Sequence, residues 1–267
     1  MVDSSPSPRR IAPRKLATLT AGAALGLAVA GAAQAAGTQG FDATGPEKFW
    51  LAVNQGGESG MAVEILTDLG LVEGHLRAGV ALYQAGLADQ AVGHMKHPQD
   101  EIYADLAAHL EDAGIAGFAE ELTALAATVE ERADAGDVEA AFAAVMTKVE
   151  EARGAAQAGA AGEAQAMLAL VRTAADEYGE GVADGAVKEL HEYQDAWGFV
   201  QVARAMAEHM AAESAAGEKA FGANALSALD EIAPALPGVS PEGRSLGDAG
   251  MLLVAAAKIE LAAYGLK

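Results

Sequence analysis

The stretch LGLVEGHLRAGVALYQAGL, residues 69–87, decides the fold. Its large apolar side chains recur every three or four residues, which places them on one face of a helix. These side chains are Leu69, Val72, Leu76, Val80, Tyr83 and Leu87. Gly86 interrupts the pattern, and we expect a turn there into a shorter helix that ends near His94. The spacing therefore predicts an amphipathic helix, and this helix also carries His75.

The same periodicity continues along the chain, and no segment alternates apolar and polar residues as a strand would. Hydrophobic residues make up 52% of the sequence and aromatic residues only 5%, so small side chains must fill much of the core. We predict an all-α fold, a helical bundle of about eight to ten helices. It would be arranged as two packed halves, residues 48–153 and 163–267, joined by an Ala/Gly-rich connector at 154–162.

Residues 1–35 have the pattern of a secretory signal peptide. A basic region precedes a short apolar run, and the small residues Ala33-Gln34-Ala35 resemble a cleavage site. A retained membrane anchor is the alternative, although the run is rich in Ala and Gly rather than Leu. No later apolar run reaches the roughly 18 residues that a membrane helix needs. We therefore expect export to the periplasm, a flexible linker at 36–47, and no integral membrane segment after cleavage.

The chain is strongly acidic, with a formal net charge of −21 at pH 7. Such a charge disfavours nucleic acid as a partner and attracts cations, although solubility alone also explains it. The chain contains no cysteine, which excludes disulfides, thiolate metal sites and cysteine nucleophiles. No nucleophile motif, phosphate-binding glycine loop or zinc-protease signature is present. We therefore predict that the protein is not an enzyme; a metallohydrolase would need an open coordination position and a general base.

The stretch GHMKHPQDEIY, residues 93–103, concentrates groups that bind metals. Imidazole and carboxylate together suit iron, copper, manganese or zinc. The metal hypothesis takes as ligands His75, His94, His97 and Glu101. A local explanation competes with it: Pro98 starts a new helix, His97 is its N-cap, and Glu101 faces the helix dipole. Both explanations remain open.

A second cluster lies in HEYQDAWGF, residues 191–199. His191 and Asp195 are four residues apart on a predicted helix, so both side chains could bind one ion, with Glu192 beside them. A helix-stabilising ion pair explains the same spacing equally well. The ligands of one ion lie about 2.0–2.2 Å from it, so a separation of the two clusters beyond about 10 Å would exclude a shared site.

A third set shares this four-residue spacing. Glu101, Asp105 and His109 fall on one face of the helix that follows Pro98. Charged side chains on one helix face are most often solvated. We therefore predict a solvated face rather than a metal site at these residues.

The second cluster also lies within a resemblance to a known family. The run EYGEGVADGAVKELHEYQDAWGF, residues 177–199, is similar to the extracytoplasmic helical segment attached to some bacterial iron permeases of the FTR1 type. The matching positions are Glu177, Tyr178, Val182, Asp184, Gly185, Val187, Glu192, Tyr193, Asp195 and Phe199. The resemblance implies a role in presenting or sensing iron, with an inner-membrane iron permease as partner.

Two departures limit this resemblance. The Arg-Glu-x-x-Glu motif and the membrane helices of the permease are absent, so the chain does not resemble the transporter itself. The imelysin-like periplasmic iron proteins, which are also exported helical bundles, are more loosely similar. Their Gly-x-His-x-x-Glu site is not reproduced by residues 93–97.

These observations lead to one functional hypothesis and one alternative. The protein is expected to be an exported, non-catalytic metal-binding protein that assists the uptake of iron or a related cation. Iron is the favoured metal, with copper, manganese or zinc as alternatives. The alternative function is a metal-free helical interaction module that docks a membrane or envelope partner through an apolar groove.

Overall fold

The computed structural model describes residues 58–241 and 246–266, and over these residues the fold is all-α, as predicted. The predicted signal peptide and linker lie outside the described residues. The helices are α2 (Glu58–Gln84), α3 (Ala88–His97), the π-helical η1 (Pro98–Ile102), α4 (Tyr103–Asp112), α5 (Ala119–Glu130), α6 (Ala135–Ala156), α7 (Gly159–Gly181), α8 (Leu190–Ala212), α9 (Ala216–Ile232) and α10 (Gly250–Ala263). A small antiparallel hairpin, β1 (Val182–Ala183) and β2 (Ala186–Val187), joins α7 to α8. No helix in the described part of the chain is long and apolar enough to cross a membrane.

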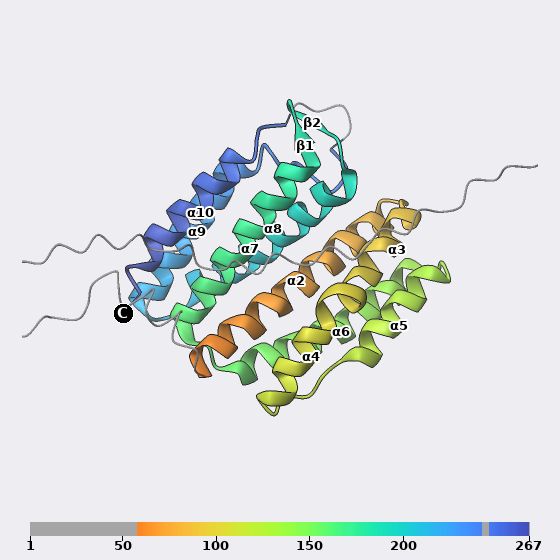
Figure 1. Ribbon diagram of the computed structural model, residues 1–267, viewed down its shortest axis with the longest axis horizontal. Coiled ribbons are helices and arrows are strands. Elements are labelled where there is room, and N and C mark those ends of the chain that lie inside the picture. The colour runs from red at the N-terminus through yellow and green to blue at the C-terminus, as the bar shows by residue number, and fades with distance from the viewer. Residues whose placement is uncertain (1–57, 242–245, 267) are drawn as a thin grey trace, which may run out of the picture. The chain divides into compact units, whose positions relative to one another are not determined.

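Helix α2 lies between the other helices of this bundle (Figure 1). It packs against α7 and α8 on one side and against α3, α4 and α6 on the other. The predicted apolar stripe is confirmed, because Leu69, Val72 and Leu76 are 0% exposed. The predicted turn after this helix is also present, and Gly86 adopts there a φ of 79° that costs glycine little.

Two hydrophobic clusters fill the interior. Helices α7 to α10 line one of them, and α2 to α6 line most of the other. Helix α2 contributes to both, with Leu66 in the first cluster and Leu69 in the second. The division of the chain into two halves stays a prediction.

The predicted connector at 154–162 is shorter than expected. Helix α6 ends at Ala156 and α7 begins at Gly159, so only Gln157 and Ala158 lie between the two helices. Gln157 adopts a left-handed conformation, with a φ of 51°. The neighbouring residues are helical because alanine has the highest helix propensity of all residues.

Two glycines let the backbones of α2 and α8 come into direct contact. A Cβ atom on Gly198 would lie 2.2 Å from the carbonyl oxygen of Gly74, and one on Gly74 would lie 2.4 Å from the ring of Phe199. Real side chains do not approach so closely, so the crossing requires glycine. His75 follows Gly74 directly, and Asp195 precedes Gly198 by about one turn. The crossing therefore brings these two side chains within reach of each other.

The boundary predicted at Pro98 is present, since α3 ends at His97 and η1 begins at Pro98. His97 occupies the N-cap position of η1 as predicted, but it has right-handed helical angles (φ −47°, ψ −47°) and its side chain makes no cap hydrogen bond. Proline lacks the N–H that an α-helical turn needs, and the chain instead widens into a π-turn, in which Tyr103 N–H donates to the Pro98 carbonyl. Because the helical path continues, the His97 side chain is available to other helices.

Candidate metal centre

Four histidines and one aspartate converge where α2, α3 and α8 meet. They form two overlapping groups that share the aspartate: His75, His97 and Asp195, and His94, His191 and Asp195. Within each group, the potential ligand atoms lie within 4.8 Å of one another. We call these five residues the His/Asp cluster. The two clusters of the sequence, whose meeting was left open, therefore come together in space.

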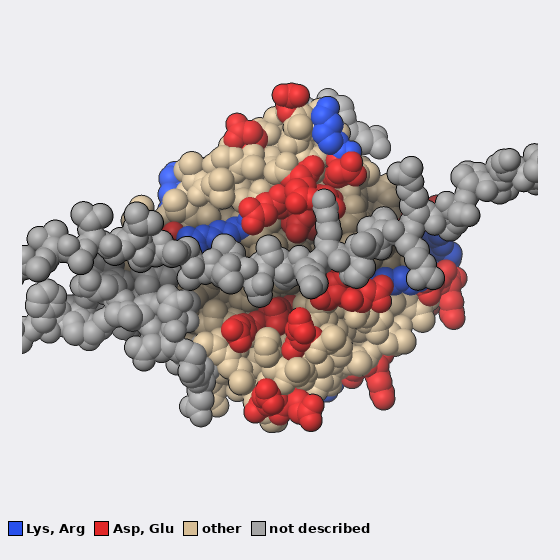
Figure 2. Space-filling view, viewed as in Figure 1, with Lys and Arg blue, Asp and Glu red and all other residues tan. Residues whose placement is uncertain are grey.

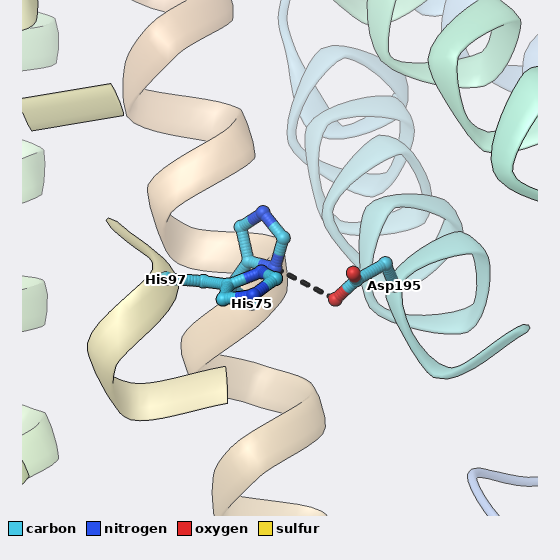
Figure 3. A group of neighbouring side chains, drawn as sticks. All are labelled: His75, His97 and Asp195. Atoms are coloured by element: carbon cyan, nitrogen blue, oxygen red, sulfur yellow. Dashed lines mark hydrogen bonds and ion pairs between the residues drawn. The ribbon is translucent and has the colours of Figure 1, made fainter. Parts of the chain in front are cut away.

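Asp195 is the centre of the His/Asp cluster. Its Oδ1 atom lies 2.6 Å from His75 Nδ1 and 2.9 Å from His94 Nδ1. Its Oδ2 atom lies 3.5 Å from His191 Nε2, which in turn is 3.2 Å from His97 Nδ1. Figure 3 shows His75 and His97 on the same side of the Asp195 carboxylate. These contacts are hydrogen bonds and ion pairs between the side chains, and they bring the atoms close enough together for one ion to replace them.

The cluster has a buried part and a more accessible part. His94 is 0% exposed, Asp195 3% and His75 7%. His97 and His191 are only partly buried. An ion would therefore reach the cluster past His97 and His191 and would be shielded from water on the opposite side.

The electrostatic environment keeps the two residues from α8 in forms that bind cations. Burial alone would raise the pKa of Asp195, but His75 and His94 together hold this pKa well below its usual range. Burial and the neighbouring His94 lower the pKa of His191 to about 4, although Asp195 opposes this shift. Near neutral pH the aspartate is an anion and the His191 ring is neutral, which are the forms that ligate metals.

A second buried carboxylate lies close to the cluster in sequence but is already paired. Glu73, two residues before His75, is 3% exposed. It accepts hydrogen bonds from Arg77 Nε and Arg153 Nη2, both at 2.7 Å. This ion-pair network joins α2 to α6. Among the buried carboxylates in the described residues, only Asp195 therefore faces the histidines.

The structure places two of the predicted ligands outside both groups. Glu101 is exposed on η1. Glu192 contacts Glu177 on α7, and burial together with the hydrogen bond to Glu192 raises the pKa of Glu177 to about 8. Near neutral pH the two neighbouring carboxyl groups therefore keep a proton between them. The roles of Glu101 and Glu192 as ligands stay predictions.

Sequence reasoning missed Gln194, which contacts the cluster directly. Gln194 is 2% exposed, and its Oε1 atom lies 2.9 Å from Nε2 of His94. Its Nε2 atom donates to Oε1 of Gln90 on α3 at 2.7 Å. A neutral amide has no spacing signature of its own, so only the neighbouring Asp195 could have drawn attention to it.

The third set of the sequence, around His109, is a surface feature. Glu101 and Asp105 are exposed and His109 is partly buried, in agreement with the predicted solvated face. His109 Nδ1 lies 3.3 Å from Asp68 Oδ2, and its Nε2 lies 3.8 Å from Glu64 Oε2. Burial raises the pKa of Asp68 to about 6, against the opposing effect of His109.

The surface around the bundle is acidic. Figure 2 shows several separate groups of acidic side chains on one face, with basic side chains at fewer places. This agrees with the net charge of −21 for the whole chain. The resulting negative potential raises the local concentration of cations.

Comparison with known proteins extends the resemblance noted at residues 177–199. No curated protein and no solved structure shows significant similarity to the chain. A family model does match, and the matched segment contains helices α7 to α10 together with His191 and Asp195. His75, His94 and His97 lie outside it. Residues 155–263 match the model of the iron permease-associated 4-helix bundle domain.

Proposed function

We propose that this protein binds a transition-metal ion at the His/Asp cluster and serves a system that takes up iron or a related cation. The observation that carries the proposal is the convergence of four imidazoles and one carboxylate from three helices. These side chains are hydrogen-bonded to one another, and each group of three, His75, His97 and Asp195 or His94, His191 and Asp195, places its ligand atoms close enough for one ion to replace such contacts.

The chemistry of the donor set favours a particular class of ion. Imidazole suits iron, copper, nickel and zinc, whereas sites for magnesium and calcium consist mainly of oxygen ligands. Four histidines beside one carboxylate therefore favour a divalent first-row ion. The match of residues 155–263 to an iron permease-associated domain supports iron, and thus Fe(II), as the ion that the protein handles.

The proposal assigns the protein a binding role without a catalytic step. The ion would be taken up through the accessible part of the cluster, at His97 and His191, and passed on from there. An iron permease in the membrane is the proposed recipient, supported by the description of the matched domain. The proposed location is the periplasm, because residues 1–35 resemble a signal peptide. Mass spectrometry of the protein from a periplasmic fraction would test this location by showing whether the chain begins after Ala35.

Metal binding is tested best on protein purified without a histidine tag. Metal analysis comes first, followed by anaerobic calorimetric titration with Fe(II), Zn(II), Cu(II) and Mn(II), and titration with Fe(III). We expect stoichiometric binding of an imidazole-preferring divalent ion. A His94→Ala/His97→Ala double variant should lose this binding.

The chain offers a matched control for this experiment. A His109→Ala/His209→Ala double variant also removes two histidines, but both lie outside the His/Asp cluster. It should bind the ion as the wild type does. Wild-type protein that binds every ion only at millimolar concentrations would refute the proposal, as would equal losses in the two double variants.

A further inference from the structure

A chain of two amides, the buried Gln194 and the partly buried Gln90, lies behind His94 on the side away from Asp195. Gln194 Oε1 lies 2.9 Å from His94 Nε2, and Gln194 Nε2 donates to Gln90 Oε1 at 2.7 Å. His94 is 0% exposed and Gln194 is 2% exposed, so bulk water does not compete for the hydrogen bond between them. Each hydrogen bond in the chain therefore constrains the direction of the next one.

This direction decides which nitrogen of His94 carries a hydrogen. Gln194 gives an amide hydrogen to Gln90, so its carbonyl oxygen faces His94. A carbonyl oxygen only accepts hydrogen bonds, and His94 Nε2 must therefore be an N–H group. The other nitrogen, Nδ1, is then the one that faces Asp195, where it can donate a hydrogen to the carboxylate or bind a metal ion.

His94 Nδ1 faces the carboxylate of Asp195. It lies 2.9 Å from Asp195 Oδ1, and both residues are buried. Without a metal, a hydrogen on Nδ1 satisfies both atoms, because the imidazole can donate it to the carboxylate. His75 Nδ1 approaches the same oxygen at 2.6 Å. A metal ion bound to both His94 Nδ1 and Asp195 would take the place of the hydrogen on Nδ1.

We propose that Gln194, held in place by Gln90, is a positioning residue that makes His94 an Nδ1 ligand and thereby strengthens the binding of a divalent ion. This inference rests on the proposed metal-binding function. Partners of a ligating histidine in other metal sites act similarly, since the hydrogen bond at one ring nitrogen fixes the tautomer that presents the other nitrogen to the ion.

Three substitutions test this inference through metal affinity. Gln194→Leu keeps the approximate volume but removes the acceptor, and should weaken Zn(II) binding by about 10–100-fold. Gln194→Glu keeps an acceptor facing His94, because the amide of Gln90 can rotate to donate to it, and should retain near wild-type affinity. Gln90→Leu frees the Gln194 side chain to rotate, and the loss of Zn(II) affinity should be smaller than in Gln194→Leu. Gln201→Leu, at a partly buried position of α8 outside the cluster, serves as the matched control.

Nitrogen NMR of the histidine rings gives a second measurement, which does not need a bound metal. In the wild type, His94 Nε2 should carry a hydrogen both without metal and with Zn(II), which is diamagnetic. In Gln194→Leu without metal, Nε2 should lose its hydrogen, because its acceptor is gone, and the ring hydrogen should lie on Nδ1 facing Asp195. Gln194→Glu should restore the wild-type pattern.

The two measurements separate failure of this inference from failure of the proposed function. Wild-type protein that binds no metal would refute the proposed function, while the NMR spectra would still decide the hydrogen-bond direction. Normal Zn(II) affinity in Gln194→Leu, or a wild-type His94 without a hydrogen on Nε2, would overturn the inference even if the protein binds metal. If Gln194→Leu does not fold, the Zn(II) affinity of Gln90→Leu and the NMR spectra of the wild type test the inference instead.

Discussion

Two pairs of residues in this protein have the same spacing in sequence and different surroundings in the fold. His191 and Asp195 on α8 are four residues apart, as are Asp105 and His109 on α4. The first pair faces three further histidines from α2 and α3. The second pair faces Glu64 and Asp68 on the surface of α2.

The difference shows that helical spacing alone does not make a metal site. Asp195 is 3% exposed and is surrounded by imidazole rings that can bind a metal ion. The His109 side chain, in contrast, is 32% exposed. The crossing of α2 and α8 at two glycines produces the first environment, because it brings the helices into backbone contact beside Asp195. The residues that surround each pair therefore decide its chemistry, and variants in both regions test this conclusion.

The largest effect is expected from Asp195→Asn. This change removes the negative charge that both ligand groups share, while the side chain keeps its size. Affinity for Fe(II) or Zn(II) should fall by more than about 100-fold, beyond the 10–100-fold that is typical for outer partners of a site. Asp105→Asn is the same chemical change in the surface pair, at an exposed position of α4, and should leave the calorimetric affinity unchanged. Similar losses in both variants would remove the distinction between the two regions.

The next effect concerns the helix crossing. Gly198→Ala would place a methyl group against the carbonyl of Gly74, and should lower the free energy of unfolding by about 1–3 kcal/mol or more. Metal affinity should fall as well, because α2 and α8 must move apart. Gly154→Ala, in α6 with open space around it, should be neutral or stabilise by about 0.5–1 kcal/mol. Urea denaturation measures the free energy of unfolding of both variants. Equal values for Gly198→Ala and Gly154→Ala would show that the close crossing does not require glycine.

A smaller effect concerns the pH dependence of stability at Asp68. In the folded protein its pKa is raised from 3.8 to about 6, mainly by burial. Between these values the folded state holds a proton that the unfolded chain has released, so stability falls as the pH rises from about 4 to 6. The loss should be about 1–3 kcal/mol, and Asp68→Asn should abolish it. Urea denaturation of both proteins at several pH values tests this, and parallel curves would contradict it.

The smallest effect is expected from His109→Ala. Its ion pairs with Asp68 and Glu64 are partly exposed, and such pairs contribute about 0–1 kcal/mol. Metal affinity should stay within about twofold of the wild type, since no coupling through shared contacts is expected over this separation. A large loss of affinity in this variant would show that the surface set also binds the metal.

Most of the fold follows from patterns that are visible in the sequence. The stripe from Leu69 to Leu87 predicts a buried helix face because apolar spacing near 3.6 residues is a local property. The boundary at Pro98 was also predictable, but the helical angles of His97 and the π-turn after it were not, because the rule that a residue before proline avoids helical angles is only a tendency. The connector between α6 and α7 is only Gln157 and Ala158, shorter than predicted, because alanine readily continues a helix.

The candidate site could be predicted only in part from the sequence. Histidines and carboxylates draw attention by their chemistry, so His75, His94, His97, His191 and Asp195 could be named from the sequence. Their meeting could not be deduced, because it depends on the crossing at Gly74 and Gly198, which joins residues more than a hundred positions apart. The place of Gln194 depends on a hydrogen bond to His94 that no spacing rule describes.

X-ray absorption spectroscopy of the metal-loaded protein would test the central claim most directly. After loading with one equivalent of Fe(II) or Zn(II), we predict a shell of nitrogen and oxygen ligands at about 2.0–2.2 Å, with the outer-shell scattering of several imidazole rings. Asp195→Asn should lose this shell, and the His109→Ala/His209→Ala variant should keep it. An oxygen-only shell without imidazole scattering would contradict the claim that the His/Asp cluster holds the ion.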